Sequence, residues 1–421
     1  MVGARWMGSR LAANYTEHPL MIEPASDTLP VLKLRRHEDK RLRGGHLWVY
    51  SNEVDTSERA LTDYEPGSVV RVLDSRDRFI GHAYINPQAL ICARILSRDE
   101  HRPIGPALLA DRLRSALALR ERLYRHGCYR LVYGESDGLP GLVLDRFGDV
   151  IVGQIATLGM EQLRPLIEAA VREVVAPRAL VWKHDGSSRD LEKLPKDLVA
   201  AFGDVPERVE IVEDGLRFTA PLAGGQKTGW FFDQAANREH LRRYVKPGAR
   251  VLDVCSYVGA WALSALNHGA GAAECVDASQ SALDAAQLNA TANGHKLGLH
   301  KGDAFDVLEQ LGAQGERYDL VVVDPPAFIK RRKDQHQGEA AYRKLNQLAM
   351  KLLTDDAILV SCSCSFHLAQ ETLPTLLQTA AGNLNRTLQL LEFGGQSPDH
   401  PVHPGIPETK YLKTLFCRVT R

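Results

Sequence analysis

The chain has 421 residues with 52 basic and 52 acidic side chains, so its formal net charge is zero. Hydrophobic residues make up 44% of the sequence, enough for real cores, and the length suggests about two to three domains. This balance excludes neither a nucleic-acid partner nor any other, and contacts to a polyanion would have to come from local basic clusters. No apolar run approaches the roughly 20 residues of a membrane span.

The seven cysteines include no CxxC pair and no cysteine–histidine spacing suited to zinc. We interpret them as free thiols in a reducing compartment, predict no metal site and expect a cytoplasmic protein. The start of the chain is too polar and interrupted for a signal peptide, so we expect residues 1–30 to be a disordered extension, with Met21 as an alternative start. The sequence leaves open whether the chain forms a homodimer.

Short strand-like runs separated by turns fill residues 31–102 and predict a small β-barrel. The first part of this segment combines clustered cations with aromatic residues, which suits a phosphate backbone and unstacked bases. A solvated basic face explains the cluster equally well. The candidate RNA-binding residues are Lys33, Arg35, Arg36, Arg43 and Trp48.

Residues 103–209 form a second predicted unit, a small central α+β domain. Leucines at helical spacing predict an amphipathic helix over 107–125, and a second helix is expected over 160–175. A hairpin closed at Phe147-Gly148 and a strand at 178–184 complete the pattern. Nothing in this segment indicates a particular chemistry.

From residue 210 to residue 421, apolar strands alternate with helical segments. This rhythm predicts a Rossmann-like, doubly wound α/β domain with a parallel sheet, whose ligand lies beyond the carboxyl ends of the strands. The turn after the strand 251–254 has the sequence CSYVG and lacks the glycines that cradle a pyrophosphate. A ligand without phosphate therefore fits better than a dinucleotide.

Acids and a glycine recur where the strands of this domain end. They are Asp253, Gly259, Asp277 and Asp303. Such a series suits S-adenosylmethionine, because an acid after the second strand can bind both ribose hydroxyls while Asp253 faces the amino-acid or sulfonium end. Aspartate also caps helices and forms turns, so Asp277 and Asp303 are individually compatible with a structural role. Their recurrence over successive strand–helix units favours the cofactor.

The segment 321–328 has the sequence VVVDPPAF. Proline fixes its own φ and restricts the residue before it, so the strand end at Asp324 is expected to be rigid. Together with Pro325, Pro326 and Phe328, it predicts a clamp for a planar base beside the methyl donor. The motif fits methyl transfer to a nucleobase amino group or to a ring carbon, without deciding between them.

The segment 358–365 has the sequence ILVSCSCS. Carbon 5 of a pyrimidine can attack a methyl donor only after a thiolate has added to carbon 6, so a ring-carbon methyltransferase needs a cysteine beside the base. In isolation the two cysteines are more typical of a buried strand. Beside a nucleobase clamp they indicate a nucleophile, and Cys364 is favoured over Cys362 because it lies further past the strand end.

These motifs resemble the bacterial RlmI-type family of ribosomal large-subunit RNA cytosine-carbon-5 methyltransferases. The likeness runs from about Val31 to the C-terminus and rests on HLWVYSNEV, YGESDGLPGLVLDRFGD, GQKTGWFFDQAANR, VLDVCSYVGAWALSAL, VDPPAF, SCS, DHPV and YLK. It implies a PUA-like RNA-binding barrel, a central α+β domain and a methyltransferase domain that uses S-adenosylmethionine. In the pattern of that family, the nucleophile is the cysteine of a single S-C-S, which falls on Cys364.

The resemblance also places the segment from Gln226 to Arg238 over the methyl donor. The further candidate cofactor contacts are Phe231, Asp233, Asn237, Tyr257 and Asp324, the last of which is also a catalytic candidate. After methylation a base must remove the proton from carbon 5. Glu408 is the preferred base, with Asp399 and His400 as alternatives.

The sequence thus predicts an S-adenosylmethionine-dependent methyltransferase that acts on carbon 5 of a cytosine in large-subunit ribosomal RNA. Two alternatives stay open. One is a guanine or adenine nitrogen methyltransferase in which Cys364 is structural. The other is an RNA-binding assembly factor without catalysis.

Overall fold

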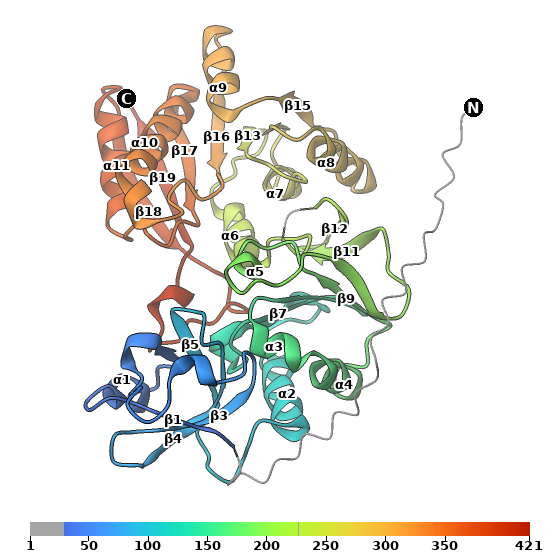
Figure 1. Cartoon of the computed structure of the whole chain (residues 1–421). Coiled ribbons are helices and arrows are strands. Elements are labelled where there is room, and N and C mark those ends of the chain that lie inside the picture. The colour runs from blue at the N-terminus through green and yellow to red at the C-terminus, as the bar shows by residue number, and fades with distance from the viewer. Residues whose placement is uncertain (1–28, 226) are drawn as a thin grey trace.

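The computed structural model describes residues 29–225 and 227–421. The extension predicted for residues 1–30 falls almost entirely outside the described residues, and so does Gln226. The described strands form three large sheets and a two-stranded one, which follow one another along the chain (Figure 1). Within the described ranges, no helix is long and apolar enough to cross a membrane.

The first sheet is the predicted small barrel, with strand order β1-β3-β4-β5-β2. Its elements are β1 (Val31–Lys33), α1 (Asp39–Arg43), β2 (Trp48–Tyr50), β3 (Val69–Leu73), β4 (Phe79–Ile85) and β5 (Ile91–Ser97). A bridge between Leu34 and Val54 joins the two edges. Alternate residues such as Val70 and Val72 are fully buried, as expected when one face of a strand packs inward.

The central domain is built on a five-stranded sheet in the order β10-β9-β8-β7-β6. Its elements are α2 (Pro106–Leu123), β6 (Cys128–Tyr133), β7 (Leu142–Phe147), β8 (Val150–Ile155), α3 (Leu158–Gln162), α4 (Arg164–Val174), β9 (Ala179–Lys183), α5 (Ser188–Leu191) and β10 (Leu198–Phe202). The helix predicted over 107–125 is confirmed as α2. The helix predicted over 160–175 is divided, because Pro165 fits the first turn of a new helix and begins α4. The hairpin turn is Gly148-Asp149, one residue later than predicted, since Phe147 pairs with Val150.

The third sheet has seven strands in the order β15-β14-β13-β16-β17-β19-β18. Its strands are β13 (Arg250–Val254), β14 (Ala272–Asp277), β15 (Gly298–Lys301), β16 (Tyr318–Val323), β17 (Leu353–Ser363), β18 (Thr387–Gly394) and β19 (Lys413–Thr420). Its helices are α6 (Ala235–His240), α7 (Ala260–Asn267), α8 (Gln280–Ala292), α9 (Ala304–Ala313), α10 (Gln335–Lys351) and α11 (Thr372–Gly382). The doubly wound fold is confirmed, but the sheet is not wholly parallel, because β19 runs antiparallel to both β17 and β18.

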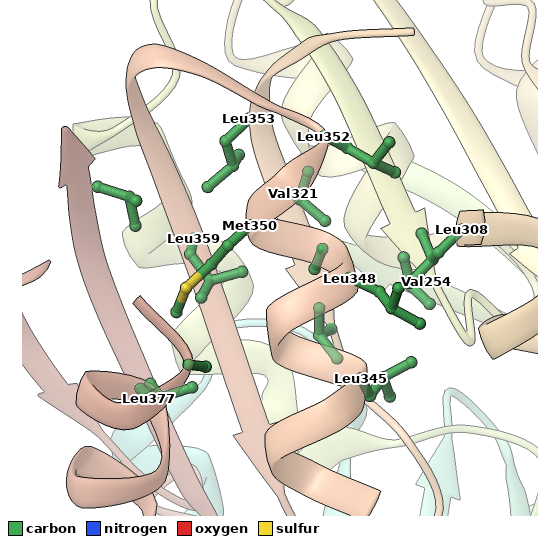
Figure 2. Close-up of a cluster of buried hydrophobic side chains, with 14 of the residues drawn as sticks. Val254, Leu308, Val321, Leu345, Leu348, Met350, Leu352, Leu353, Leu359 and Leu377 are labelled. Carbon is green, nitrogen blue, oxygen red and sulfur yellow. The ribbon is translucent and has the colours of Figure 1, made fainter. Parts of the chain in front are cut away.

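Helices cover both faces of this sheet, so its strands are apolar on both sides. Figure 2 shows Leu345, Leu348 and Met350 of α10 packed toward Val321 of β16 and Leu359 of β17. A two-stranded hairpin, β11 (Arg208–Glu213) and β12 (Leu216–Pro221), packs against α7 and α8. The sheet core therefore holds the carboxyl ends of the central strands in fixed positions.

The connection between β18 and β19, residues 395–412, leaves the third sheet and reaches the barrel (Figure 1). We call it the crossing segment. Its Ile406 is fully buried in the core of the barrel. The Asp399 carboxylate accepts a hydrogen bond from the backbone of Arg130 at 2.8 Å, and the hydroxyl of Tyr133 donates to the carbonyl of Thr409 at 2.9 Å. The crossing segment thus ties all three parts of the molecule together.

Candidate active site

A cavity of about 510 Å³ opens at the carboxyl ends of β13, β14 and β16. Parallel strands bring residues that are distant in sequence to this one edge of the sheet. The residues predicted from the sequence that line the cavity are Phe231, Asp233, Tyr257, Asp277, Asp303, Asp324, Pro325, Pro326, Phe328 and Cys364. We call this the first cavity.

The turn from β13 into α7 forms one wall of the first cavity. Cys255 and Tyr257 have φ values of 64° and 49°, in the left-handed region that residues with a side chain rarely adopt. Gly259 has a φ of 80°, and a Cβ there would come within 3.0 Å of Ala286. Gly259 shapes the turn and does not itself line the cavity, which corrects its assignment as a cofactor contact.

Asp277 and Asp303 hold backbone turns and also line the first cavity. The Asp277 carboxylate accepts from the backbone of Tyr257 at 2.9 Å and of Ser279 at 2.8 Å. Asp303 caps α9 by accepting from the backbone of Phe305 at 2.9 Å. A carboxylate oxygen has more than one acceptor site, so both residues can hold the turn and still accept from hydroxyl groups in the cavity.

Two other predicted cofactor contacts lie behind the cavity wall. Asp253 is fully buried, and its carboxylate accepts from the backbone of Ala262 at 3.1 Å. Asn237 donates to the side chain of Gln234 at 2.7 Å and to the carbonyl of Gly395 at 2.8 Å. Neither lines the cavity, so the structure corrects both assignments: these residues support the wall instead of facing the ligand.

Asp324 directly follows the end of β16 and lines the first cavity. Its carboxylate accepts from the amide of Gln234 and from the indole of Trp261, both at 3.1 Å. Burial raises the pKa of Asp324 to about 6, although these two bonds oppose the shift. Trp261 was not predicted from the sequence, because an aromatic residue in an apolar helix is more typical of a core. The carboxylate is therefore held in place and titrates close to neutral pH.

Asp233 presents an unsatisfied acceptor. One of its carboxylate oxygens is bonded by the Tyr411 hydroxyl and lies 3.5 Å from the Lys227 ammonium. The other, Oδ1, is buried and has no hydrogen-bond partner among the described residues. Burial acts to raise the pKa of Asp233, but Lys227 and His400 outweigh it and hold the pKa well below its usual range. A buried, ionised acceptor on a cavity wall fits a cationic ligand group.

Cys364 and Cys362 have different surroundings. Cys362 is fully buried within β17, with its sulfur 3.5 Å from the Thr414 hydroxyl. Cys364 follows the strand end, is half-buried and lines the first cavity, where its sulfur lies 4.0 Å from the carbonyl oxygen of Pro325. Burial raises the pKa of the Cys364 thiol to about 11, with Lys227 opposing the shift. Only Cys364 of the pair can meet a ligand.

Two family models match the chain, a PUA-like domain over residues 32–98 and an S-adenosylmethionine-dependent methyltransferase over residues 190–417. The ribosomal RNA large subunit methyltransferase I of Erwinia tasmaniensis is 35% identical over 398 residues, which cover 92% of this chain and 99% of that one. The same enzyme from Salmonella arizonae is 33% identical and covers 95% and 100%. The chain belongs to the ribosomal RNA large subunit methyltransferase I family.

The fold of this family member is also that of a solved S-adenosylmethionine-dependent methyltransferase from Streptococcus mutans. The two chains superpose with a TM-score of 0.77 at 21% identity, covering 93% of this chain and all of the other. A second solved methyltransferase, complexed with SAH, gives a TM-score of 0.78 at 21% identity with the same coverage. The predicted family, fold class and cofactor are confirmed.

The first cavity of this methyltransferase fits S-adenosylmethionine in its chemistry. The ligand carries an ammonium and a sulfonium, and the wall offers the buried, unpartnered oxygen of Asp233. Its ribose has hydroxyl donors, and Asp277 and Asp303 supply acceptors. When bound, the cofactor supplies an electrophilic methyl group. The chain's own residues then have to hold the nucleophilic atom of the substrate beside it.

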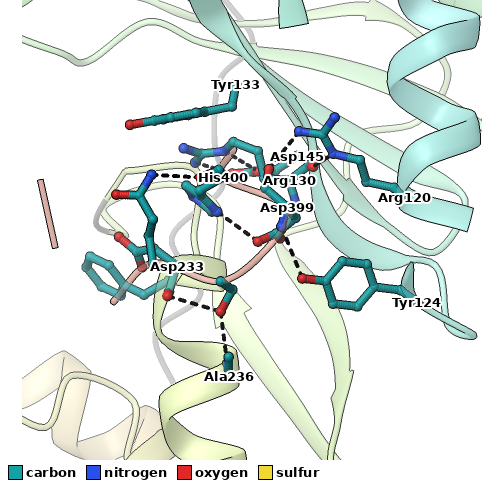
Figure 3. A network of polar contacts seen from close by, with 12 residues as sticks. Arg120, Tyr124, Arg130, Tyr133, Asp145, Asp233, Ala236, Asp399 and His400 are labelled. Carbon is teal, nitrogen blue, oxygen red and sulfur yellow. Dashed lines mark hydrogen bonds and ion pairs between the residues drawn. The ribbon is translucent and has the colours of Figure 1, made fainter. Parts of the chain in front are cut away.

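Glu408, the preferred general base, is not in the first cavity of the methyltransferase. It is exposed and lines a different cavity, beside Trp48 of the barrel. The alternatives Asp399 and His400 are buried and hydrogen-bonded to each other at 2.8 Å (Figure 3). The prediction of Glu408 is therefore corrected: the segment after residue 394 turns toward the barrel, which its sequence did not reveal.

The barrel cations are largely paired with acids. Lys33 lies 2.8 Å from Asp77, and Arg43 bonds the carboxylates of Asp39 and Asp74 at 2.8 Å each. Arg35 donates to the carbonyl of Val54 at 3.0 Å, whereas Arg36 has no ion pair with any residue that the structure describes. The acids thus compensate most of the positive charge of this part of the methyltransferase. Trp48 does not belong to the group of cations, because it lines the same cavity as Glu408.

Proposed function

We propose that this protein methylates carbon 5 of a cytosine in large-subunit ribosomal RNA through a covalent bond between Cys364 and carbon 6. The relatives named as ribosomal RNA large subunit methyltransferases support the substrate class. The observation that carries the choice of atom is the position of the Cys364 sulfur, on the wall of the first cavity and 4.0 Å from the carbonyl of Pro325. Pro325, Pro326 and Phe328 would hold the base against it.

In the proposed reaction, the Cys364 sulfur bonds to carbon 6 and the electrons of the carbon 5–carbon 6 double bond make carbon 5 nucleophilic. Because the pKa of the thiol is about 11, the attack requires a proton acceptor. The Asp324 carboxylate, on the same cavity wall, takes the thiol proton and releases it to solvent before the later steps, and Lys227 stabilises the thiolate that forms. After carbon 5 has gained the methyl group, it loses its proton and the thiolate leaves, which restores the ring.

Asp324 is the best base for that last proton. It lines the cavity together with Cys364 and has a pKa of about 6, so a carboxylate near neutral pH can take the proton and release it again. Asp233 also lines the cavity, but its pKa is held well below the usual range, which makes it a poorer acceptor. Asp324 thus replaces Glu408 in the proposed mechanism.

The alternative of a nitrogen methyltransferase needs no thiol beside the base. Cys362 shows the environment of a purely structural cysteine in this strand, fully buried and against Thr414. Cys364 instead faces the cavity, which favours ring-carbon chemistry. The unpartnered, buried carboxylate oxygen of Asp233 suits the binding of a methyl donor, which an assembly factor without catalysis does not need.

Trapping with large-subunit ribosomal RNA that contains 5-fluorocytosine tests the proposal. Fluorine at carbon 5 blocks the final elimination, so wild-type protein with S-adenosylmethionine should form an RNA adduct that survives denaturing electrophoresis. Cys364→Ala should form none, and its methylation rate should fall by about a thousandfold or more. Cys362→Ala is the matched control and should keep the adduct. Normal turnover by Cys364→Ala would instead indicate nitrogen methylation.

A further inference from the structure

A second cavity, of about 420 Å³, lies where the three parts of the molecule meet. Trp48 of the barrel, Tyr133 and His184 of the central domain, and Glu408 of the crossing segment all line it. Its volume is within the range of small-molecule sites. We call it the second cavity, and no step of the proposed reaction uses it.

The second cavity has aromatic surface and hydrogen-bond acceptors, but few free cations. Trp48 is half-buried and donates its indole N–H to Glu135 at 2.9 Å. Arg189 is bonded to Glu161 at 2.8 Å, and Arg94 lies 3.5 Å from Glu192. Because these guanidinium groups already face carboxylates, a phosphate would find little uncompensated positive charge. A neutral, planar ligand fits better.

One buried atom on this wall lacks a partner. His184 is 1% exposed, and its Nδ1 is hydrogen-bonded to Asp197 at 2.8 Å. Its Nε2 is buried and has no hydrogen-bond partner in the part of the chain that the structure describes. Buried polar atoms in native proteins are normally satisfied, so this imidazole has an acceptor or donor that the described residues leave unused beside the cavity.

The two cavities share a wall. The ring of Tyr133, on the second cavity, lies 6.5 Å from the ring of Tyr411, whose hydroxyl bonds Asp233 on the first cavity. Lys183, also on the second cavity, donates to the backbone carbonyl of Lys227 on the first. Figure 3 shows the polar network in which Tyr133 and Asp233 lie. The residues that line the two cavities are therefore in direct contact, which makes the cavities neighbours.

We infer that the second cavity holds another unstacked base of the same RNA strand, close in sequence to the target cytosine, that carries an exocyclic amino group. Trp48 and Tyr133 offer aromatic faces for stacking, which is how proteins commonly hold single-stranded bases. The carboxylates of Glu135 and Glu408 can accept from the amino group, as acids do when they contact cytosine. The inference rests on the proposed RNA substrate and deepens it, because it makes recognition depend on a neighbouring base.

An abasic scan tests the inference with the full-length protein. The probe is a large-subunit ribosomal RNA fragment that forms the 5-fluorocytosine adduct, with each nucleotide near the target replaced in turn by an abasic one. Wild type should lose about tenfold in affinity at one such position, the expected effect of one stacked base. Trp48→Ala should bind the intact fragment about tenfold more weakly and lose nothing further at that position.

Two variants separate the inference from damage to the barrel. Trp48→Phe keeps an aromatic face and should retain most of the affinity and the sensitivity to that position. Phe79→Ala removes a half-buried barrel aromatic that contacts His82 and does not line the second cavity, and it should bind as wild type does. Equal losses by wild type and Trp48→Ala at every position would overturn the inference while adduct formation persists. Absence of any adduct would instead defeat the proposed function.

Discussion

The two cavities are built in different ways. The first opens at the edge of a single sheet, and two of its acids have shifted pKa values, with the pKa of Asp324 raised and that of Asp233 lowered. The second lies between three separate parts, and the guanidinium groups that line it are paired with carboxylates. Buried charge with unequal pKa values suits proton transfer, whereas paired charge around aromatic rings suits recognition. Methyl transfer in the first cavity and recognition of a neighbouring base in the second would therefore take place on the two sides of one shared wall.

The largest effect is expected where the second cavity depends on the crossing segment. Ile406→Ala removes part of a fully buried side chain from the barrel core and should lower the free energy of unfolding by about 2 to 5 kcal/mol. Urea denaturation measures this. Val402→Ala, at an exposed position of the same segment, should change it by less than about 0.5 kcal/mol. Equal effects of the two variants would mean that the barrel does not depend on this anchor.

The free energy of unfolding is expected to depend on pH because of Asp253, the acid behind the wall of the first cavity. Burial, reinforced by Asp324 and Asp277, raises the pKa of Asp253 to about 8, against about 3.9 in an unfolded chain. The folded state holds this proton more tightly, so the group's contribution to stability is complete below about pH 4 and is lost as the pH rises to about 8.

Asp253→Asn has the same shape and does not titrate. Between pH 5 and pH 8, wild type should therefore lose about 3 to 4 kcal/mol of unfolding free energy relative to this variant, measured by urea midpoints. Asp284→Asn, on the exposed side of α8, serves as the control and should follow wild type. Parallel curves for wild type and Asp253→Asn would show that this buried acid is not protonated in the folded protein, which would weaken the contrast between the cavities.

A smaller effect is expected at Lys227. Its ammonium lowers the pKa of the Cys364 thiol against the effect of burial, so Lys227→Met should raise that pKa above about 11. Alkylation of Cys364 by iodoacetamide at about pH 9 should become several-fold slower, as followed by mass spectrometry of its peptide. Lys330→Met, an exposed lysine outside the cavity wall, should react as wild type does. Faster alkylation in Lys227→Met would contradict the assigned electrostatics.

The first cavity was largely predictable, because its residues stand at strand ends. Asp277, Asp324 and Cys364 each end or follow an apolar run, Asp303 follows the edge strand, and a parallel sheet gathers such positions at one edge. The prediction that Asp253 contacts the cofactor was wrong. Asp253 is the second-to-last residue of β13, and the alternation of side chains along a strand does not say which of them point into the cavity. Side-chain direction was the missing information.

The second cavity was not predictable from the sequence. Trp48 and Glu408 are 360 positions apart, and no local pattern joins them. The segment 395–412 contains prolines, histidines and glycines that are typical of any loop, so its course toward the barrel left no signal. The ion pairs of the barrel cations could not be predicted either, because Asp74 and Asp77, which pair with Arg43 and Lys33, come from a separate turn.

The burial of Ile406 in the barrel also bears on how the chain is made. Domains generally fold in the order in which the ribosome delivers them, with the N-terminal one first. Here the barrel strands, which end at Ser97, emerge early, yet the residue that completes their core follows about 300 positions later. The site that Ile406 fills in the barrel core therefore stays empty until translation is almost finished. By then strands β13 to β18 of the third sheet have also been synthesised, so the barrel core is completed only after most of the methyltransferase sheet is present.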